Sequence, residues 1–566
     1  MVASKAQEVD PSLPPVRALI EAYQEDASAL RRFHPWRMSM ARHQRMGTLI
    51  EQFSHRLNGI RFTPLSQEER IDYLLFQNQL KFDERRLTQE RQRHAEIQPW
   101  IRFGDGILAL AEARQRVEPI DPESAAVVLH ALAGEIRSTL DELEQEASSK
   151  PTAILAVRIA DWTEVYRRAL EDWFAFYEGY HPAFSWWTQA PQEQVIQELK
   201  TFASEVRKQF AGYQEGEDPP VIGDPIGRQA LMEALEYEMV AYTPEALLEI
   251  ARMEFDWCRK ERLRASRELG FGEDWRAAYD HVKSKYVPPG EQPQLIKTLA
   301  QEAIDFLEDR SLLTIPPLAK EVWRMQMMSA ERQKVNPYFT GGEVISVSYP
   351  TEEMAHEDKL MSMRGNNVHF ARATVHHELI PGHHLQLFMA DRYRTHRQLF
   401  RTPFLVEGWA LYWEMLLWDL DFQRSAEDRL GMLFWRSHRC ARILFSLGFH
   451  LGEMSAEEAI AFLVKEVGHE PRNARAEVRR SVQGGYVPLY QAAYMLGGLQ
   501  LRALREELVD TGHMSDRAFH DAILKENAIP IDLIRASLMS TDLKPDYKPR
   551  WRFYRALEEQ EEPGKS

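Results

Sequence analysis

Hydrophobic residues recur every three or four positions along most of the chain, which is the pattern of amphipathic helices. Between residues 124 and 147 this stripe consists of Val128, Leu132, Ile136, Leu140 and Leu143. The same spacing predicts further helices at 296–307, 426–451, 456–467 and 492–508. The chain is therefore expected to be mainly α-helical.

Capping residues define one helix more closely. Thr243 is a favourable N-cap, Pro244 suits the first helical position, and Glu245 makes the first turn acidic. The helix is expected to continue to about Leu269 and to end at Gly270. Local signals thus predict both ends of this helix.

One segment has a different pattern. Residues 343–349 are β-branched and alternating, and they lie between Gly341–Gly342 and Pro350, which predicts a short β-strand. The strand is either a structural hairpin arm or an edge along which an extended substrate binds. The expected fold class is mainly α, with a large multi-helix body and a small β element near 343–349.

Breaks in the helical pattern fall at 215–227, which is rich in Gly, Pro and acidic residues, and at 286–293. Neither break is long or biased enough to be a flexible linker. Two helical lobes are therefore expected to form one continuous body. The expected segments are an N-terminal tail at 1–14, a helical N-terminal lobe at 15–330, a catalytic lobe at 331–556 and a charged tail at 557–566.

The 566 residues are 44% hydrophobic and 28% charged, which is an ordinary globular composition. The formal net charge of -16 disfavours nucleic acid as a partner, because nucleic-acid-binding surfaces are usually basic. Two cysteines, Cys258 and Cys440, are too few for a disulfide framework or a thiolate-rich metal site. Any zinc would therefore be held by histidine and carboxylate.

The chain as given begins without an apolar segment of signal-peptide length, and it has no run of about 18 uncharged apolar residues. The most apolar candidate, 411–420, is interrupted by Glu414 and Asp419. We therefore expect a cytoplasmic protein without a membrane partner, although a trimmed export precursor would look the same. The sequence does not indicate an oligomeric state.

The run from Ala373 to Gln386 reads Ala-Thr-Val-His-His-Glu-Leu-Ile-Pro-Gly-His-His-Leu-Gln. Four of the nineteen histidines lie in it beside Glu378, namely His376, His377, His383 and His384. In the zinc motif His-Glu-x-x-His, two histidines four residues apart share a helical face, and the glutamate polarises the metal-bound water. The alternative is a helix end with surface histidines before a Pro-Gly stop.

The position four residues after His377 is Pro381, so the standard spacing is absent. In an unbroken helix His383 would point roughly 120° away from His377, and His384 would lie about 10 Å further along the axis. Pro381 and Gly382 favour a distortion, and a bulge that absorbs both residues would return His383 to the metal face. His383 is the expected ligand, with His384 as the runner-up or as a substrate contact.

A carboxylate follows in the run Phe404-Leu-Val-Glu-Gly-Trp-Ala-Leu-Tyr-Trp-Glu. Glu407 lies in an apolar helical stripe, which is unfavourable for a charge unless it is paired or bound to a metal. Gluzincin enzymes take their third ligand from a glutamate on a later helix and leave a fourth position for water. We expect one Zn²⁺ per chain at His377, His383 and Glu407, with Glu414 orienting a ligand histidine. The alternatives are a helix-start carboxylate for Glu407 and a surface ion pair for Glu414.

The segments from His377 to Gln386 and from Glu407 to Tyr412 resemble the bacterial family known as domain of unknown function 885. Its members are regarded as candidate zinc metallopeptidases. Residues 243–248 and the helix after them are similar to the middle region of that family, so the likeness spans most of the chain. The resemblance implies a mainly helical, gluzincin-like metallopeptidase fold.

Toward the C-terminus the chain departs from the family pattern at Ser446, where the family has Asp, and at Leu489–Tyr490, where it has Gly-Gln. These departures weaken a transfer of substrate-binding roles, but they leave the metal site intact. The chain keeps the family residues Arg442, Gly448, His450, Pro488, Tyr494 and Gly497.

The expected function is hydrolysis of peptide bonds in short peptides by a metal-activated water, with Glu378 as the general base. Two alternatives stay open: a zinc hydrolase of a non-peptide amide or ester, and a catalytically silent binding protein on the same fold. Metal analysis and product analysis would separate them.

Such a reaction also requires a donor for the developing oxyanion, commonly a Tyr or His from a remote segment. Tyr494 and His450 are the expected catalytic donors, and Tyr486 is a further candidate. The expected substrate contacts are Arg442, which can bind a carboxylate in a bidentate manner, together with Tyr490 and His384. Each of these side chains has an alternative role in helix packing.

Overall fold

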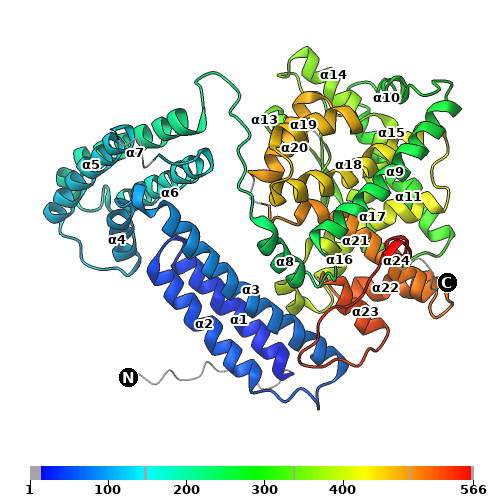
Figure 1. Cartoon of the computed structure of the whole chain (residues 1–566), viewed down its shortest axis with the longest axis horizontal. Helices are drawn as coiled ribbons and strands as arrows, with labels where there is room; N and C mark the ends of the chain where they lie inside the picture. Colours follow the sequence, from blue (N-terminus) through cyan, green and yellow to red (C-terminus); the bar gives the residue numbers. More distant parts are fainter. Residues whose placement is uncertain (1–13, 146–149, 336–337, 484–485, 562–566) are drawn as a thin grey trace. The chain divides into compact units, whose positions relative to one another are not determined.

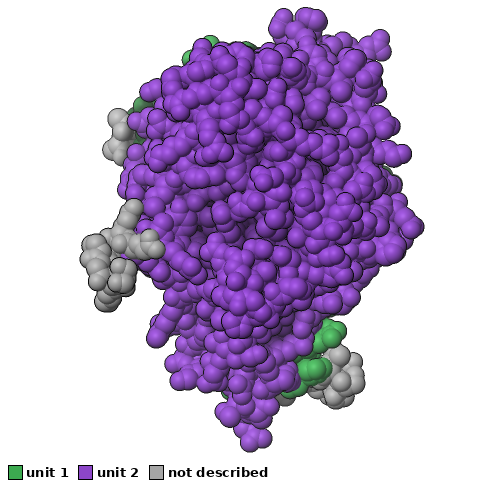
Figure 2. Space-filling model, turned by 90° about the vertical axis from the view of Figure 1, so that its right-hand side faces the viewer, with its two compact units in different colours: residues 1–60, 77–224 green, residues 61–76, 225–566 purple. Residues whose placement is uncertain are grey.

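The computed structural model describes residues 14–145, 150–335, 338–483 and 486–561. Close contacts divide the chain into two units, which Figure 2 colours separately: residues 1–60 with 77–224, and residues 61–76 with 225–566. The first unit ends at Asp224, which lies inside the predicted break at 215–227. Of the expected tails, residues 1–13 and 562–566 lie outside the described residues, and 557–561 are part of a C-terminal helix.

Among its described residues, the first unit is helical throughout (Figure 1). Helices α5 and α6 both pack against α7, and α4 packs against α6, around fully buried Leu129, Leu170 and Phe202. Helix α1 packs against α2, with an edge-to-face contact between Tyr23 and Phe53. The elements are α1 (Pro15–Phe33), α2 (Met40–Asn58), α3 (Gln67–Ile97, whose first turns belong to the second unit), η1 (Gln98–Trp100), α4 (Gly104–Gln115), α5 (Pro122–Gln145), α6 (Ala153–Tyr177) and α7 (Pro182–Ala211).

In its described part, the second unit contains the remaining helices and two short strands (Figure 1). Its elements are α8 (Gly227–Tyr237), α9 (Pro244–Glu268), α10 (Trp275–Lys283), α11 (Gln292–Asp309), α12 (Pro317–Val322), β1 (Arg324–Met327), α13 (Ala330–Val335), β2 (Val344–Val347), α14 (His356–Gly365), α15 (Val368–Glu378), α16 (His383–Ala390), η2 (Thr395–Phe400), α17 (Pro403–Asp419), α18 (Ala426–Leu451), α19 (Ala456–Phe462), η3 (Leu463–Val467), α20 (Pro471–Val482), α21 (Tyr490–Arg505), η4 (Glu506–Asp510), α22 (Asp516–Lys525), α23 (Ile531–Leu538) and α24 (Arg555–Glu561).

These elements confirm the mainly helical prediction. Helix α18 has the predicted bounds, and α9 begins at Pro244, where the Thr243 hydroxyl accepts a hydrogen bond from the backbone N–H of Ala246 at 3.3 Å. Gly270 follows the end of α9 with a φ of 86°, a left-handed value that glycine adopts readily. The helices predicted at 456–467 and 492–508 are present, but each ends in one π-helical turn.

The predicted strand is also present. β2 pairs in parallel with β1, and Arg324 lies opposite Val344. β1 escapes sequence analysis because Arg-Met-Gln-Met has no β-branched residue. Ile345 of β2 is fully buried in a cluster with Ile296 and Val375, so the lobe boundary expected at residue 330 runs through one shared hydrophobic cluster.

Helices α15, α17, α18 and α21 meet in the interior of the second unit. α17 and α21 cross at two glycines, where a Cβ on Gly497 would lie 1.9 Å from the carbonyl oxygen of Phe404. A Cβ on Gly408 would in turn lie 2.6 Å from the Cα of Gly497. The two backbones are therefore close enough for side chains from both helices to surround one point.

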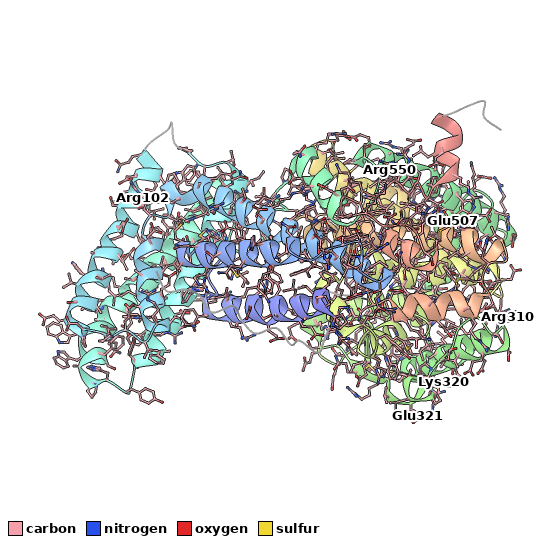
Figure 3. The ribbon with its side chains drawn as sticks, turned by 90° about the horizontal axis from the view of Figure 1, so that it is seen from below. Arg102, Arg310, Lys320, Glu321, Glu507 and Arg550 are labelled. Atoms are coloured by element: carbon pink, nitrogen blue, oxygen red, sulfur yellow. The ribbon has the colours of Figure 1, made fainter. Side chains whose placement is uncertain are left out.

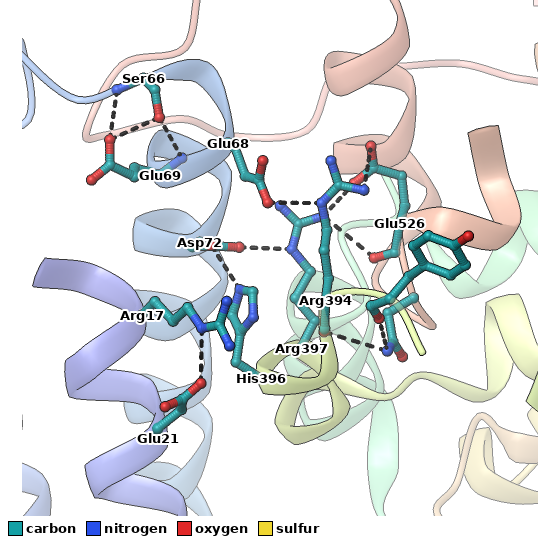
Figure 4. A network of polar contacts seen from close by, with 12 residues as sticks. Arg17, Glu21, Ser66, Glu68, Glu69, Asp72, Arg394, His396, Arg397 and Glu526 are labelled. Carbon is teal, nitrogen blue, oxygen red and sulfur yellow. Dashed lines mark hydrogen bonds and ion pairs between the residues drawn. The ribbon is translucent and has the colours of Figure 1, made fainter. Parts of the chain in front are cut away.

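A buried ion-pair network binds residues 61–76 to the rest of the second unit (Figure 4). Arg397 is fully buried, and its Nε donates to Asp72 Oδ1 at 2.7 Å while its Nη1 pairs with Glu526. The Nε2 of His396 lies 2.9 Å from the second oxygen of Asp72. Each charge in this network faces an opposite charge.

The outer surface carries many charged side chains, among them the exposed Arg102, Arg310 and Arg550 (Figure 3). Ion pairs are common on it, as between Lys320 and Glu308 at 2.7 Å. In the described part of the chain, no helix combines the length and the apolar character needed to span a bilayer.

Candidate metal centre

The histidine-rich run folds as two helices with a turn between them. α15 ends at Glu378 and α16 begins at His383, so the predicted bulge is instead a complete interruption at residues 379–382. Pro381 lacks the N–H that a continuous helix would need. Gly382 approaches the preceding turn so closely that a Cβ on it would lie 1.8 Å from the carbonyl oxygen of His377. The interruption allows His383 to turn back toward His377.

Three side chains from three helices meet at one buried point. Potential ligand atoms of His377 on α15, His383 on α16 and Glu407 on α17 all lie within 4.8 Å of one another. The two imidazole rings are 4.9 Å apart at 86°. The Nε2 of His383 lies 3.2 Å from Glu407 Oε2, but this buried oxygen has no hydrogen-bond partner among the described residues. We call these three residues the His-His-Glu cluster.

Two neighbours hold the cluster in place. The Nδ1–H of buried His377 donates to Glu414 Oε1 at 2.6 Å, which leaves the Nε2 of His377 facing the cluster. The hydroxyl of Tyr490 donates to Glu407 Oε1 at 2.5 Å. The expected contact of Glu414 with a histidine is therefore present. Tyr490 is engaged with Glu407, and its substrate-binding role stays a prediction.

The cluster is electrostatically coupled. Burial alone would raise the pKa of Glu407, but His383 and His377 hold it well below its usual range. Burial alone would lower the pKa of His383, but Glu407 raises it above its ordinary value. In Glu414, the hydrogen bond from His377 overcomes the effect of burial and lowers the pKa. Glu407 and His383 thus stabilise each other's charged forms at this point.

Glu378 follows His377 directly and is half-buried at the end of α15. A Cβ on Gly341 would lie 2.3 Å from Glu378 Oε2, so glycine is needed where the chain enters β2 past this carboxylate. The backbone N–H of Gly342 donates to the carbonyl oxygen of Glu378 at 3.3 Å. Burial raises the pKa of Glu378, whereas His377 and His383 act in the opposite direction.

The other two histidines of the run point elsewhere. The Nε2–H of His384 donates to the backbone carbonyl of Ala319 at 2.7 Å, away from the His-His-Glu cluster. His376 is buried, its ring contacts Phe422, and burial lowers its pKa to about 4. The geometry therefore places His383 in the cluster and leaves His384 as a structural contact of α12.

Helices α18 and α21 supply the neighbouring wall. The half-buried ring of Tyr494 stacks on the His377 ring, with centroids 6.4 Å apart and planes at 13°. The guanidinium carbons of Arg439 and Arg442 lie 4.6 and 4.7 Å from the centroid of the Tyr494 ring. Arg442 also donates from Nε to Glu477 Oε1 at 2.6 Å. Tyr494 thus adjoins His377, and Arg442 contacts Tyr494; their roles as oxyanion donor and substrate contact stay predictions.

The two other candidate oxyanion donors, His450 and Tyr486, are less well placed relative to the cluster than Tyr494. His450 contacts Phe449 near the C-terminal end of α18, eleven residues and about 16 Å of helix beyond Arg439. Tyr486 is 36% exposed, and its ring contacts that of Tyr490, whose hydroxyl is the one bonded to Glu407. The geometry favours Tyr494 over both as a group that reaches the cluster.

Arg439 and Gly341 are the residues that the sequence reasoning missed. Arg439 lies three positions before Arg442, so helical spacing would have placed both on one face. Gly341 was recognised only as a strand boundary. No local signal in the sequence predicts its contact with Glu378, because the two residues are 37 positions apart.

The geometry defines a mainly helical protein with a buried His-His-Glu cluster, and comparison with known sequences agrees with the resemblance seen in its motifs. Residues 32–538 match the family described as "Bacterial protein of unknown function (DUF885)", and the chain belongs to this family. No curated protein matches the chain.

Two solved structures share the fold. A protein from Shewanella oneidensis, described as a candidate lipoprotein of unknown function, is 17% identical with a TM-score of 0.70, and the match covers 93% of this chain and 100% of that one. A candidate lipoprotein from Colwellia psychrerythraea is 14% identical with a TM-score of 0.59, over 93% and 98% of the two chains. At these identities the likeness concerns the fold alone.

Proposed function

We propose that the protein is a zinc-dependent peptidase that hydrolyses peptide bonds in short peptides. The observation that supports this most is the convergence of His377, His383 and Glu407 on one buried point beside Glu378. The third residue of the cluster lies on a later helix than the two histidines, as the third ligand of gluzincin enzymes does, although the two histidines here lie on separate helices.

The residues present fit a zinc ion. Two imidazoles and one carboxylate are a donor set that zinc takes in hydrolytic sites, where a fourth position is left for water. The buried Glu407 Oε2 lacks a hydrogen-bond partner among the described residues, and a cation would satisfy it. Glu414 fixes His377 with its Nε2 toward the cluster. A bound zinc ion would make coordinated water acidic and polarise the scissile carbonyl.

The protein's own side chains would carry the protons. Glu378 accepts a proton from the attacking water and delivers it to the leaving amine. The hydroxyl of Tyr494 has no hydrogen bond with another described residue, and the ring that carries it stacks on His377, so Tyr494 is our candidate donor for the oxyanion. Tyr490 holds Glu407 through its hydroxyl and orients this carboxylate.

Two cellular locations are open for this peptidase, the cytoplasm and a site outside it. The sequence favours the cytoplasm, whereas the structural relatives are described as candidate lipoproteins, which favours a location outside it. Fractionation of cells that express the full gene distinguishes these two locations.

Metal analysis of protein purified without chelators tests the proposal. We expect one zinc ion per chain, loss of most of it in His383→Ala, and retention in His384→Ala, because only His383 faces the cluster. Absence of a transition metal from zinc-supplied protein would reject the metal site. Loss in His384→Ala alone would reassign the second ligand.

Digestion of a mixed peptide library tests the chemistry. Glu378→Gln is expected to lower turnover by several orders of magnitude while zinc content stays close to that of the wild type, since a general base is lost and no ligand is removed. Near-normal activity of this variant would remove Glu378 from the mechanism.

A further inference from the structure

The wall of the metal centre carries an arginine without an acidic partner. Arg439 on α18 is only 7% exposed, yet it forms no ion pair or hydrogen bond with any other described residue. Its contacts are aromatic, with the guanidinium carbon 4.6 Å from the Tyr494 centroid and 5.6 Å from that of Trp435. A buried guanidinium in this state is unfavourable unless a ligand supplies the missing anion.

The neighbouring Arg442 shows what a satisfied arginine on this helix looks like. Its Nε donates to Glu477 Oε1 at 2.6 Å, and Arg480 donates to the other oxygen of Glu477 at 2.8 Å. Both oxygens of Glu477 are therefore occupied. The Nη1 of Arg442 is buried without a hydrogen bond among the described residues, so it can contribute one donor beside Arg439.

The charge of Arg439 acts on the catalytic region. Its positive charge interacts with the carboxylates of Glu378, Glu407 and Glu414 without forming a hydrogen bond to any of them. Its guanidinium lies 4.6 Å from the Tyr494 ring, which is 6.4 Å from the His377 ring. The path from the Arg439 guanidinium through the Tyr494 ring to the His377 ring is therefore spanned by no more than about three residues of extended peptide.

We propose that Arg439, assisted by Nη1 of Arg442, binds the C-terminal carboxylate of the peptide substrate, so that the enzyme removes one to three residues from the C-terminal end of short peptides. The inference rests on the proposed peptidase function and names its substrate class. A guanidinium binds a carboxylate through two parallel hydrogen bonds. The terminal carboxylate is common to all free peptides, so it allows recognition without a side-chain preference.

The rival explanation is that Arg439 only offsets the carboxylates of the metal centre. That role would not depend on the end of the substrate. The experiment therefore compares one short peptide in three forms: with a free C-terminal carboxylate, with a C-terminal amide, and as the amide with an internal Asp near the scissile bond. Products are identified by mass spectrometry with zinc-loaded protein.

The wild type is expected to cleave the free acid about 10- to 100-fold faster in kcat/KM than either amide, as charge-assisted hydrogen bonds allow. Arg439→Met should lose that factor on the free acid and keep the rate on the amides. Arg439→Lys should keep only part of the preference. Arg429→Met, on the same helix and paired with Glu268, should match the wild type on all three peptides.

Equal cleavage of free acid and amide by the wild type would overturn this inference and leave the peptidase proposal standing. An equal loss on all three peptides in Arg439→Met would show the offsetting role. Selective cleavage of the Asp-containing amide would assign Arg439 to a side-chain carboxylate, against the proposal.

A binding measurement tests the carboxylate-binding role of Arg439 independently of peptidase activity. Titration of the free acid and the amide into Glu378→Gln by calorimetry should show about 10- to 100-fold tighter binding of the acid, lost in Glu378→Gln/Arg439→Met. If the wild type cleaves no peptide, the peptidase proposal fails, and this titration alone then decides the role of Arg439.

Discussion

Arg397 and Arg439 are both buried arginines of the second unit, and they differ in what surrounds the guanidinium. Arg397 faces Asp72 and Glu526, whereas Arg439 faces the rings of Trp435 and Tyr494. Burial lowers the pKa of both side chains, but Asp72 and Glu526 raise that of Arg397 above its usual value. Beside Arg439, the like charge of Arg442 lowers the pKa further.

The contrast separates two uses of a buried charge. The guanidinium of Arg397 is neutralised within the fold by Asp72 and Glu526, as Figure 4 shows, and these ion pairs connect segments distant in sequence. Among the described residues Arg439 has no anionic partner, and Glu407 Oε2 has no hydrogen-bond partner. Glu407 belongs to the His-His-Glu cluster, and Arg439 contacts Tyr494, whose ring stacks on that of His377. Incomplete buried charge is unfavourable for stability, and it persists where a ligand completes it.

The largest effect is expected from breaking the complete network. Arg397→Met would leave the carboxylates of Asp72 and Glu526 buried without their cation. We expect a loss of about 3 to 5 kcal/mol in the free energy of unfolding. Urea unfolding of metal-free protein, followed by tryptophan fluorescence, measures it. A loss below about 1 kcal/mol would mean that water or repacking replaces the arginine, and that completeness does not distinguish the two sites.

Glu238 is a buried carboxylate without a cationic partner among the described residues, and it differs from Arg439 in one respect. A carboxylate can take up a proton and become neutral, whereas an arginine keeps its charge. Glu238 is buried and accepts a hydrogen bond from the Thr402 hydroxyl. Burial raises its pKa to about 7. In the unfolded chain the value is near 4.5, so between these values the folded state holds a proton that the unfolded state has released.

Stability from this group is therefore fully present below pH 4.5 and is lost as the pH rises through 7. The loss amounts to at most about 3 kcal/mol. Glu238→Gln should remove this dependence, so its stability relative to the wild type should rise between pH 4.5 and pH 8. Urea unfolding of both proteins across that range tests the expectation. Parallel curves would show that Glu238 is ionised in the fold.

Sequence reasoning reached the helices and the residues of the cluster because their signals are local. The stripes of α5 and α18 and the cap at Thr243 follow from neighbouring residues alone. The density of histidines before a helix-borne Glu407 likewise pointed to one site. Strand β1 gave no such signal, since its pairing with β2 comes from residues about 20 positions later.

Contacts between distant segments account for what the sequence could not show. The interruption at 379–382 depends on how closely Gly382 approaches His377, and the pattern alone allowed a bulge. The partner of His384 is the backbone carbonyl of Ala319, which has no side-chain signature. Arg439 has no ion pair because the packing of the helices keeps every described carboxylate out of hydrogen-bonding distance, and this packing cannot be deduced from the sequence.

The smallest effect on stability is expected at Arg439 itself. Arg439→Met removes a buried charge that has no carboxylate partner, and methionine keeps an apolar stem against Trp435 and Tyr494. The lost cation–π contacts and the relieved desolvation act in opposite directions. We therefore expect a change within about 1 kcal/mol in the metal-free protein, measured beside Arg397→Met under the same urea conditions. A loss as large as that of Arg397→Met would show that Arg439 is needed for the fold, and the contrast between the two arginines would then fail. A small change in stability together with selective loss of binding to the free-acid peptide would instead show that the arginine serves the ligand.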